Sequence, residues 1–420
     1  MRLTREDFIN QYPPLTLMNG KELESLKMPS KKHLYVHIPF CVKRCQFCYY
    51  KTYETLSMQL PDTYIEALIQ EIQMIDASHT VLNSMYWGGG TPTLMSEKQI
   101  VMLMEAIKEK FCFADNAEFC CEMRPGPELT KEKLQLLKDY GLQRASLGCQ
   151  SLNDVVLQKN GRNHSKRAFL RAYELVKEMH YRCINVDMMT GMLGDNLVLF
   201  MDSMRQLAQL HPENITIYKM QLYYNSQLYR RLRKEQLSLL TDQEEYHLAE
   251  TAYQYLLESG YVLADNFSFK TKEEYEHIHR TRTWLGEDMI GVGLSAHSCV
   301  GRVIYQNESD IERYYGKIAA QKLPVYRAYR FSIYEQMIRH FIFGVKRCHY
   351  QFDSFYEAFG CDVRDIFHKQ LNFLVENNFV NVENDIMVTT LTGALYADDI
   401  VRSIFPNGQD KALMGHQKRG

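Results

Sequence analysis

The chain has 420 residues, of which 45% are hydrophobic and 24% charged, and its formal net charge is −2. This is the composition of an ordinary globular protein that is long enough for one large domain and a smaller second one. The near-neutral charge argues against a general binder of nucleic acid or membrane surfaces, because such proteins carry a strong basic excess.

The cysteines and the N-terminus bear on the cellular compartment. The 11 cysteines are an odd number and most stand singly within apolar runs, which favours a reducing compartment over a disulfide framework. The first residues lack the pattern of a signal peptide, and no apolar run approaches the length of a membrane-spanning helix. We therefore expect a cytoplasmic monomer with no membrane or nucleic-acid partner.

Residues 1–30 show no strong periodicity and are expected to form an N-terminal arm. From residue 33, short apolar runs alternate with amphipathic segments at a period of roughly 30 residues, which is typical of βα units in a parallel sheet. The expected strands are Leu34–Ile38, Ser84–Trp87, Glu118–Glu122, Arg144–Gly148, Cys183–Met189 and Asn214–Tyr218. The expected helices between them are Pro61–Asp76, Glu97–Lys110, Lys131–Tyr140, Ser165–His180 and Leu197–Leu210.

Six such units without a seventh and eighth predict a partial (β/α)6 TIM-type barrel over residues 31–320. The pattern then changes to helices at Phe331–Gly344 and Arg364–Asn377, a hairpin-like stretch at Phe379–Thr390 and a last helix. Residues 321–420 are therefore expected to form an α-rich, winged-helix-like C-terminal domain that packs tightly on the barrel.

Cys41, Cys45 and Cys48 follow the first expected strand with the spacing C-x3-C-x2-C. Thiolates are soft ligands that suit iron–sulfur clusters and zinc. Three of them can hold three irons of a [4Fe–4S] cubane and leave the fourth iron open for S-adenosylmethionine (SAM), whose reductive cleavage yields a 5′-deoxyadenosyl radical. A structural zinc site with His37 as a fourth ligand is the alternative. Tyr50 is expected to pack over the loop rather than to ligate a metal.

A glycine-rich segment, Gly88-Gly89-Gly90-Thr91-Pro92, comes directly after the second expected strand. Consecutive glycines let the backbone approach a ligand closely. The cysteine triplet and this segment together resemble the two motifs of radical SAM enzymes, in which the glycine segment holds the amino end of SAM.

Further motifs narrow the resemblance. They are Cys121–Pro125, Ser146–Ser151, Gly161–His164, Asn185–Gly191 and Gly291–Ser298, in addition to Tyr35–Cys48 and Gly88–Pro92. With them the chain resembles the oxygen-independent coproporphyrinogen III oxidase family, whose relatives include heme chaperones, anaerobic heme-degrading enzymes and class C radical SAM methyltransferases. The resemblance covers about residues 33–300, and the C-terminal pattern continues it to about residue 405.

The resemblance implies a [4Fe–4S] cluster, two SAM molecules and a set of site residues. Tyr35, Gly89 and Glu122 would contact the cluster-bound SAM. The residues that would border a second SAM are Phe47, Gly90, Thr91, Gln150, Arg162, Asp187 and Gln221. Tyr35, Glu122 and Asp187 are the candidate catalytic residues. A carboxylate at the end of a barrel strand can bind a ribose diol or an ammonium group, and an arginine can pair with a carboxylate.

The sequence also departs from its relatives at two places. The coproporphyrinogen oxidases carry a further cysteine where this chain has Tyr50. The heme chaperones carry the string H-N-x-x-Y-W where this chain has His279-Arg280-Thr281-Arg282-Thr283-Trp284.

These departures leave three functions open. The leading expectation is class C-type methyl or methylene transfer, in which the radical made from one SAM activates a second SAM that adds to an sp2 carbon of an unsaturated or aromatic substrate. The first alternative is hydrogen abstraction from a tetrapyrrole side chain, and the second is a heme-binding chaperone without turnover. The expected partners are a small-molecule or peptide substrate and an electron donor such as flavodoxin or ferredoxin.

Overall fold

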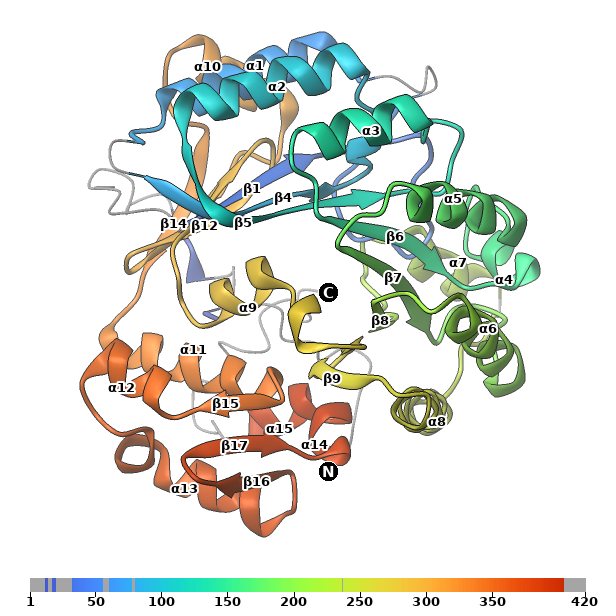
Figure 1. Cartoon of the computed structure of the whole chain (residues 1–420), viewed down its shortest axis with the longest axis vertical. Helices are drawn as coiled ribbons and strands as arrows, with labels where there is room; N and C mark the ends of the chain where they lie inside the picture. The colour runs from blue at the N-terminus through green and yellow to red at the C-terminus, as the bar shows by residue number, and fades with distance from the viewer. Residues whose placement is uncertain are drawn as a thin grey trace.

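The computed structural model describes residues 12–13, 17–19, 32–55, 60–77, 80–235 and 237–403. Its main feature is a 12-stranded sheet with the strand order β14-β13-β12-β11-β1-β4-β5-β6-β7-β8-β10-β9. Helices α1, α2 and α10 cover one side of this sheet, and the C-terminal region lies on the other side (Figure 1). Among the described residues, no helix is long and apolar enough to cross a membrane.

The six expected strands are all present and run parallel to one another. Their bounds are β1 His33–Ile38, β4 Val81–Gly89, β5 Cys112–Met123, β6 Arg144–Gln150, β7 Cys183–Thr190 and β8 Asn214–Lys219. Most are longer than predicted, because the additional residues mix apolar with polar or glycine residues and so do not continue a regular apolar run. The mixed α/β fold with a large parallel sheet is confirmed.

The helices between these strands also agree with the prediction. They are α1 Asp62–Met74, α2 Glu97–Lys110, α3 Lys131–Asp139, α5 Lys166–Glu178 and α6 Leu197–Leu210. Four of them begin at a side chain that accepts a hydrogen bond from the first turn, namely Ser96, Thr130, Ser165 and Asn196. A short helix, α4 (Asp154–Lys159), was not predicted.

Strand β1 shows how the sheet divides core from site. Leu34, Val36 and Ile38 are fully buried in the main hydrophobic cluster, which also contains the apolar face of α1. Tyr35 and His37 alternate with them and therefore point to the opposite face, into the lumen of the partial barrel. The polar site residues of the neighbouring strands share that lumen.

The sheet continues beyond the predicted barrel at both edges. On one side β11 (Met289–Val292) pairs in parallel with β1, and β12 (His297–Val300), β13 (Val303–Asn307) and β14 (Val325–Arg330) follow in antiparallel order. On the other side β10 (Ser268–Lys270) and β9 (Val262–Asp265) extend β8. The sequence did not predict these strands, because runs this short carry little periodicity. The expected division at residue 320 falls before β14.

Four helices and two very short strands complete this part of the chain. The helices are α7 Gln227–Lys234, α8 Asp242–Glu258, α9 Ile278–Trp284 and α10 Ile311–Ala319, and the strands are β2 Phe40–Cys41 and β3 Tyr53–Glu54. Helix α9 lies between the sheet and α11 (Figure 1).

The C-terminal region has its own hydrophobic cluster, which includes Ile338, Phe341, Val363 and Leu374. Its elements are α11 Ile333–Lys346, β15 His349–Gln351, α12 Asp353–Phe359, α13 Val363–Glu376, β16 Val380–Glu383, β17 Ile386–Thr389, α14 Leu391–Leu395 and α15 Ala397–Ser403. The hairpin is therefore present, but the single last helix was wrong. Two short helices stand there, since the chain breaks at Tyr396. Most of the predicted N-terminal arm lies outside the described residues.

Candidate active site at the barrel mouth

Cys41 ends β2, and Cys45 and Cys48 lie on the loop between β2 and β3, which we call the cluster loop (residues 42–52). The two short strands pair in parallel, Phe40 with Tyr53, and so close the loop at its base. The backbone N–H of Gln46 donates to the Asn160 carbonyl at 3.1 Å, and the Gln46 carbonyl accepts from Leu228 N–H at 2.8 Å. The loop is thus held from two neighbouring elements.

The cysteine thiols are partly buried and already have hydrogen-bond donors. Thr91 Oγ1 donates to Cys41 Sγ at 3.6 Å, and Arg162 Nη1 donates to Cys45 Sγ at 3.1 Å. Burial raises the pKa of Cys41 to about 12 and that of Cys48 to about 11, and the nearby thiols add to both shifts. A buried set of thiols releases its protons when a metal binds, because the cation replaces the lost hydration.

The donor chemistry fits an iron–sulfur cluster, since all three ligands are thiols and the N–H and O–H donors aim at their sulfurs. Within the described part of the chain, no three His, Cys, Asp or Glu side chains are grouped as ligands of a single metal ion. His37 is not grouped with the cysteines in this way, and its Nδ1 is hydrogen-bonded to Tyr35 Oη at 3.0 Å. Burial lowers the pKa of His37 to about 4, so the ring is neutral.

The glycine segment ends β4 directly beside this loop. Gly89 has a φ of +111°, and a Cβ there would lie 2.6 Å from the His37 ring. A Cβ on Gly90 would lie 2.5 Å from the Phe40 carbonyl oxygen. Only glycine fits at these two positions, so the backbone of Gly88–Gly90 stays bare toward the lumen.

Glu122, near the end of β5, is held by Tyr86 and Gly89, of which only Gly89 was predicted as a site residue. Its Oε1 accepts from Tyr86 Oη at 2.7 Å, and its Oε2 accepts from Gly89 N–H at 3.0 Å. Burial raises the pKa of this carboxyl group above its ordinary value. A cationic ligand at this place would offset that burial.

Asp187, on β7, is the second carboxyl group of the lumen. Its two oxygens accept from Asn185 Nδ2 at 2.8 Å and Ser146 Oγ at 3.2 Å. Burial, followed by the negative charge of Glu122, raises its pKa to about 7. Because the shift caused by Glu122 is electrostatic, the two carboxylates share one environment.

Three other predicted residues carry buried polar atoms that have no partner. These atoms are Gln150 Oε1, Arg162 Nε and Gln221 Nε2. Gln150 also has a left-handed φ of 64°, which a non-glycine residue adopts only at some cost. Arg162 spans from Cys45 to the Gly148 carbonyl, to which Nη2 donates at 2.7 Å. We call Glu122, Gln150, Arg162, Asp187 and Gln221 the mouth. Its unpaired donors and acceptors fit a polar ligand of the SAM type.

The aromatic residues of the cluster loop pack beside the mouth. Tyr49 stands between Tyr50 and Tyr223, with ring centroids 4.2 and 4.3 Å away. Phe47 packs in a small apolar cluster with Leu228 and Leu232 of α7.

A polar network at the other end of the lumen was not predicted. Its members, which we call the floor, are His33, Ser84, Glu118, Arg144, Asn214 and His279. Arg144 donates to Glu118 at 3.1 Å and to Asn214 at 3.0 Å, while Ser84 Oγ bonds His33 at 2.8 Å and His279 at 2.7 Å. The only sequence signal was the alternation of polar residues along the strands.

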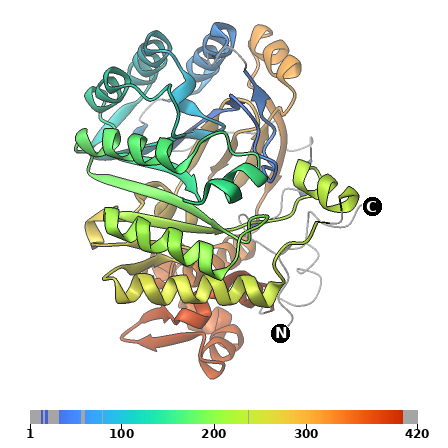
Figure 2. The same cartoon turned by 90° about the vertical axis from the view of Figure 1, so that its right-hand side faces the viewer.

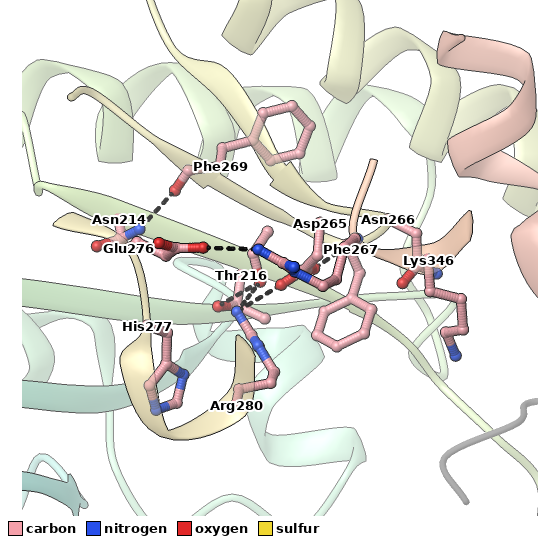
Figure 3. Close-up of polar contacts among 12 residues, drawn as sticks. Asn214, Thr216, Asp265, Asn266, Phe267, Phe269, Glu276, His277, Arg280 and Lys346 are labelled. Atoms are coloured by element: carbon pink, nitrogen blue, oxygen red, sulfur yellow. Dashed lines mark hydrogen bonds and ion pairs between the residues drawn. The ribbon is translucent and has the colours of Figure 1, made fainter. Parts of the chain in front are cut away.

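The segment around α9 packs against the floor, since Arg144 donates to the Tyr275 carbonyl and His279 N–H donates to Glu118. Figure 3 shows Arg280 beside Asp265, with an ion pair of 2.7 Å, and Asn214 beside Phe269. Arg280 also donates to Ser268 Oγ at 2.7 Å. His277 stacks on Tyr86 at 5.5 Å, and its buried Nε2 has no hydrogen-bond partner.

The comparisons agree with this geometry. The sequence pattern of the radical SAM superfamily matches residues 35–207. The heme chaperone HemW of Haemophilus influenzae is 30% identical over 270 residues, which cover 63% of this chain and 69% of that protein. The chain belongs to the radical SAM superfamily. Within it, the chain falls in the family of HemW and the oxygen-independent coproporphyrinogen III oxidases.

Two relatives match over greater lengths. HemW of Bacillus subtilis is 27% identical over 373 residues, covering 88% of this chain and 98% of that protein. The oxygen-independent coproporphyrinogen III oxidase of Synechocystis is 28% identical over 396 residues, covering 86% and 84%. In structure, coproporphyrinogen III oxidase (HemN) from Escherichia coli superimposes with a TM-score of 0.78 and 24% identity, covering 90% of this chain and 91% of that one.

Membership of the radical SAM superfamily establishes which cofactors the protein uses. Radical SAM proteins use a [4Fe–4S] cluster and SAM, so the interpretation of the triplet as a zinc site was wrong. The expectation of methyl transfer gains no support from these relatives, whose names concern coproporphyrinogen oxidation and heme.

Proposed function

We propose that the protein abstracts a hydrogen atom from a side chain of a tetrapyrrole, as an oxidase-like or heme-degrading radical SAM enzyme. The names of the relatives that match most of the chain support a tetrapyrrole substrate. Methyl transfer, which the resemblance to class C enzymes suggested, lacks such support.

Cys41, Cys45 and Cys48 would hold the cluster, and Arg162 and Thr91 would donate to its ligand sulfurs. When bound, the cluster supplies the electron that cleaves SAM. Glu122 is fixed by Tyr86 and Gly89, so it offers a rigid carboxylate to the ammonium or ribose hydroxyl groups of SAM. The bare backbone of Gly88–Gly90 gives SAM room to approach.

The proposed abstraction exchanges one hydrogen atom. A C–H bond of the substrate side chain breaks, the hydrogen forms a new C–H bond in 5′-deoxyadenosine, and one unpaired electron stays on the substrate side chain. Asp187, Gln150 and Gln221 would position the substrate or a second SAM through the polar groups that they turn to the lumen. Helix α9 and the floor close the far end of the lumen, which keeps water away from a radical.

The observation that favours enzyme over chaperone is the place of His279. This residue stands where the heme chaperones carry the histidine of their H-N-x-x-Y-W string. Here its side chain is 6% exposed and its Nδ1 is bonded to Ser84 at 2.7 Å. Burial lowers its pKa to about 3. An imidazole enclosed below the mouth in this way is a poor candidate for a heme ligand at the surface.

The test uses a substrate labelled with deuterium. Reconstituted, reduced protein is incubated with SAM and with coproporphyrinogen III or heme deuterated on the propionate side chains. We expect deuterium in 5′-deoxyadenosine, in step with consumption of the tetrapyrrole. The control is the Glu122→Gln variant, which retains the cluster ligands but loses the carboxylate.

Other outcomes would overturn the proposal. S-adenosylhomocysteine in step with a methylated product would restore methyl transfer. Stoichiometric binding of hemin without formation of 5′-deoxyadenosine would favour the chaperone. In that case His279→Ala should leave hemin binding unchanged, because this side chain is buried.

A further inference from the structure

Helix α7 is strongly amphipathic and stands beside the cluster loop. Its Leu228 is fully buried and packs, together with Leu232, against Phe47 of that loop. Arg230, Arg233 and Lys234 lie on the exposed part of the helix. Figure 2 shows α7, in yellow-green, standing apart from the helices that cover the sheet.

Three polar contacts fix α7 to the cluster loop. Leu228 N–H donates to the Gln46 carbonyl at 2.8 Å, and Arg231 donates to the Gln46 side chain and, at 3.2 Å, to the Lys159 carbonyl. Asn225, just before the helix, donates to the Tyr49 carbonyl at 3.3 Å. Gln46 follows Cys45 directly and Tyr49 follows Cys48, so the helix is anchored next to two cluster ligands.

The exposed cations on and beside α7 form a set, which we call the basic face: Lys159, whose carbonyl accepts from Arg231, and Arg230, Arg233 and Lys234 of the helix. None of the four is in an ion pair with another described residue, whereas Arg231 is paired with Glu235 at 2.9 Å. The whole chain carries a net charge of −2, so this concentration of positive charge is local. Unpaired like charges repel one another, and they gain when an anionic surface covers them.

We propose that the basic face binds a small acidic electron-transfer protein that reduces the cluster. The proposal rests on the proposed function in one respect: SAM must be cleaved, and each cleavage requires one electron. In the step itself the donor loses one electron and the cluster gains it, and no atom is transferred.

The position of the face favours a redox partner over a nucleic acid or a membrane. A donor on α7 lies next to the loop that carries Cys45 and Cys48, whose side chains are partly exposed. The floor and α9 close the opposite end of the lumen, so an electron entering from there would have a longer way to travel.

The experiment measures cluster reduction without substrate and without SAM, so its result does not depend on the tetrapyrrole proposal. Reduced flavodoxin is the donor, and bleaching of the cluster absorbance is followed by stopped flow at 20 mM and 500 mM salt. The variant is Arg230→Glu/Arg233→Glu/Lys234→Glu. The matched control is Lys98→Glu/Lys108→Glu/Lys322→Glu, which changes the net charge equally at exposed sites away from the loop.

We expect the α7 variant to lose about tenfold or more in the flavodoxin rate constant at low salt, and the wild-type rate to fall with salt, as steered association does. The control should keep the wild-type rate within about twofold. Photoreduced deazariboflavin, which is small and uncharged, should reduce all three proteins equally. The dissociation constant for oxidised flavodoxin, measured by biolayer interferometry, should rise in the α7 variant alone.

Equal flavodoxin rates in wild type and α7 variant would overturn the proposal, as would an equal loss in the control. Loss of binding to a 20-nucleotide RNA in the α7 variant, with unchanged flavodoxin rates, would assign the face to nucleic acid instead. If the triple glutamate variant fails to fold, Arg230→Gln/Arg233→Gln/Lys234→Gln removes the charges without reversing them and should lose about threefold or more.

Discussion

The mouth and the floor of the barrel lumen are built from similar residues, but they differ in whether all their buried polar atoms have hydrogen-bond partners. Every floor residue is paired: Glu118 with Arg144, Arg144 with Asn214, and His33 and His279 with Ser84. At the mouth, Gln150, Arg162 and Gln221 each keep a buried atom without a partner. A satisfied buried network stabilises the fold, whereas several unpartnered polar atoms gathered at one place can be satisfied by a ligand.

The largest effect should come from the cluster ligands. Changing Cys41, Cys45 and Cys48 together to Ala removes all thiolate ligands, so the reconstituted variant should contain less than a tenth of the roughly four iron and four sulfide that a cubane needs. Iron and sulfide assays and the loss of the brown chromophore check this. Retention of the cluster in the variant would place it elsewhere.

At the floor, Arg144→Ala should cost stability. It leaves Glu118 buried without its cation, which typically costs about 3–5 kcal/mol. Urea unfolding of the protein measures the loss. The double variant Glu118→Ala/Arg144→Ala should recover part of it, because no charge then remains unpaired. A loss below about 1 kcal/mol in Arg144→Ala would contradict the view that the floor, unlike the mouth, stabilises the fold.

At the mouth, Arg162→Ala should impair ligand binding more than folding. We expect SAM to bind roughly 10–100-fold more weakly, the value of a charged hydrogen bond, while the free energy of unfolding falls by about 1 kcal/mol. Equilibrium dialysis with labelled SAM and urea unfolding measure the two quantities. Arg162→Lys retains the charge without the planar guanidinium group, so its affinity for SAM should lie between those of the wild type and Arg162→Ala.

The pH dependence of stability sharpens the comparison further. Burial raises the pKa of Asp187 to about 7, above the ordinary value of 3.8. The folded protein therefore binds this proton more tightly than the unfolded chain, and stability is lost as pH rises from about 4 to 7. Asp187→Asn removes this term, so the variant should gain on the order of 1–3 kcal/mol at pH 8 and nothing below pH 4. Urea unfolding at pH 4, 6 and 8 tests this, and equal differences at every pH would contradict it.

The smallest effect is expected at Tyr50, which is 44% exposed and stacks on Tyr49. Tyr50→Phe keeps the ring and removes only the hydroxyl group, so stability should change by less than about 0.5 kcal/mol. The cluster spectrum and the rate of SAM cleavage should also stay as in wild type. Loss of iron would show that the phenol ligates the cluster.

The sequence by itself determined the six parallel strands, their helices and the cluster loop. Apolar runs and cap residues such as Ser96 and Asn196 are local signals, and the spacing of Cys41, Cys45 and Cys48 indicates an iron–sulfur cluster once the glycine segment Gly88–Gly90 is read with it. The motifs also placed Glu122 and Asp187 at strand ends, where the structure has them at the lumen.

Only the tertiary structure decided how the two ends of the lumen differ. His279 is far from Ser84 in sequence, as Arg144 is from Asn214, and no local pattern shows that these pairs meet. The edge strands β9 to β14 were missed for the same reason, because short segments owe their conformation to the strands beside them. Which polar residues end up paired and which stay open to a ligand depends on contacts between distant segments, and those exist only in the folded chain.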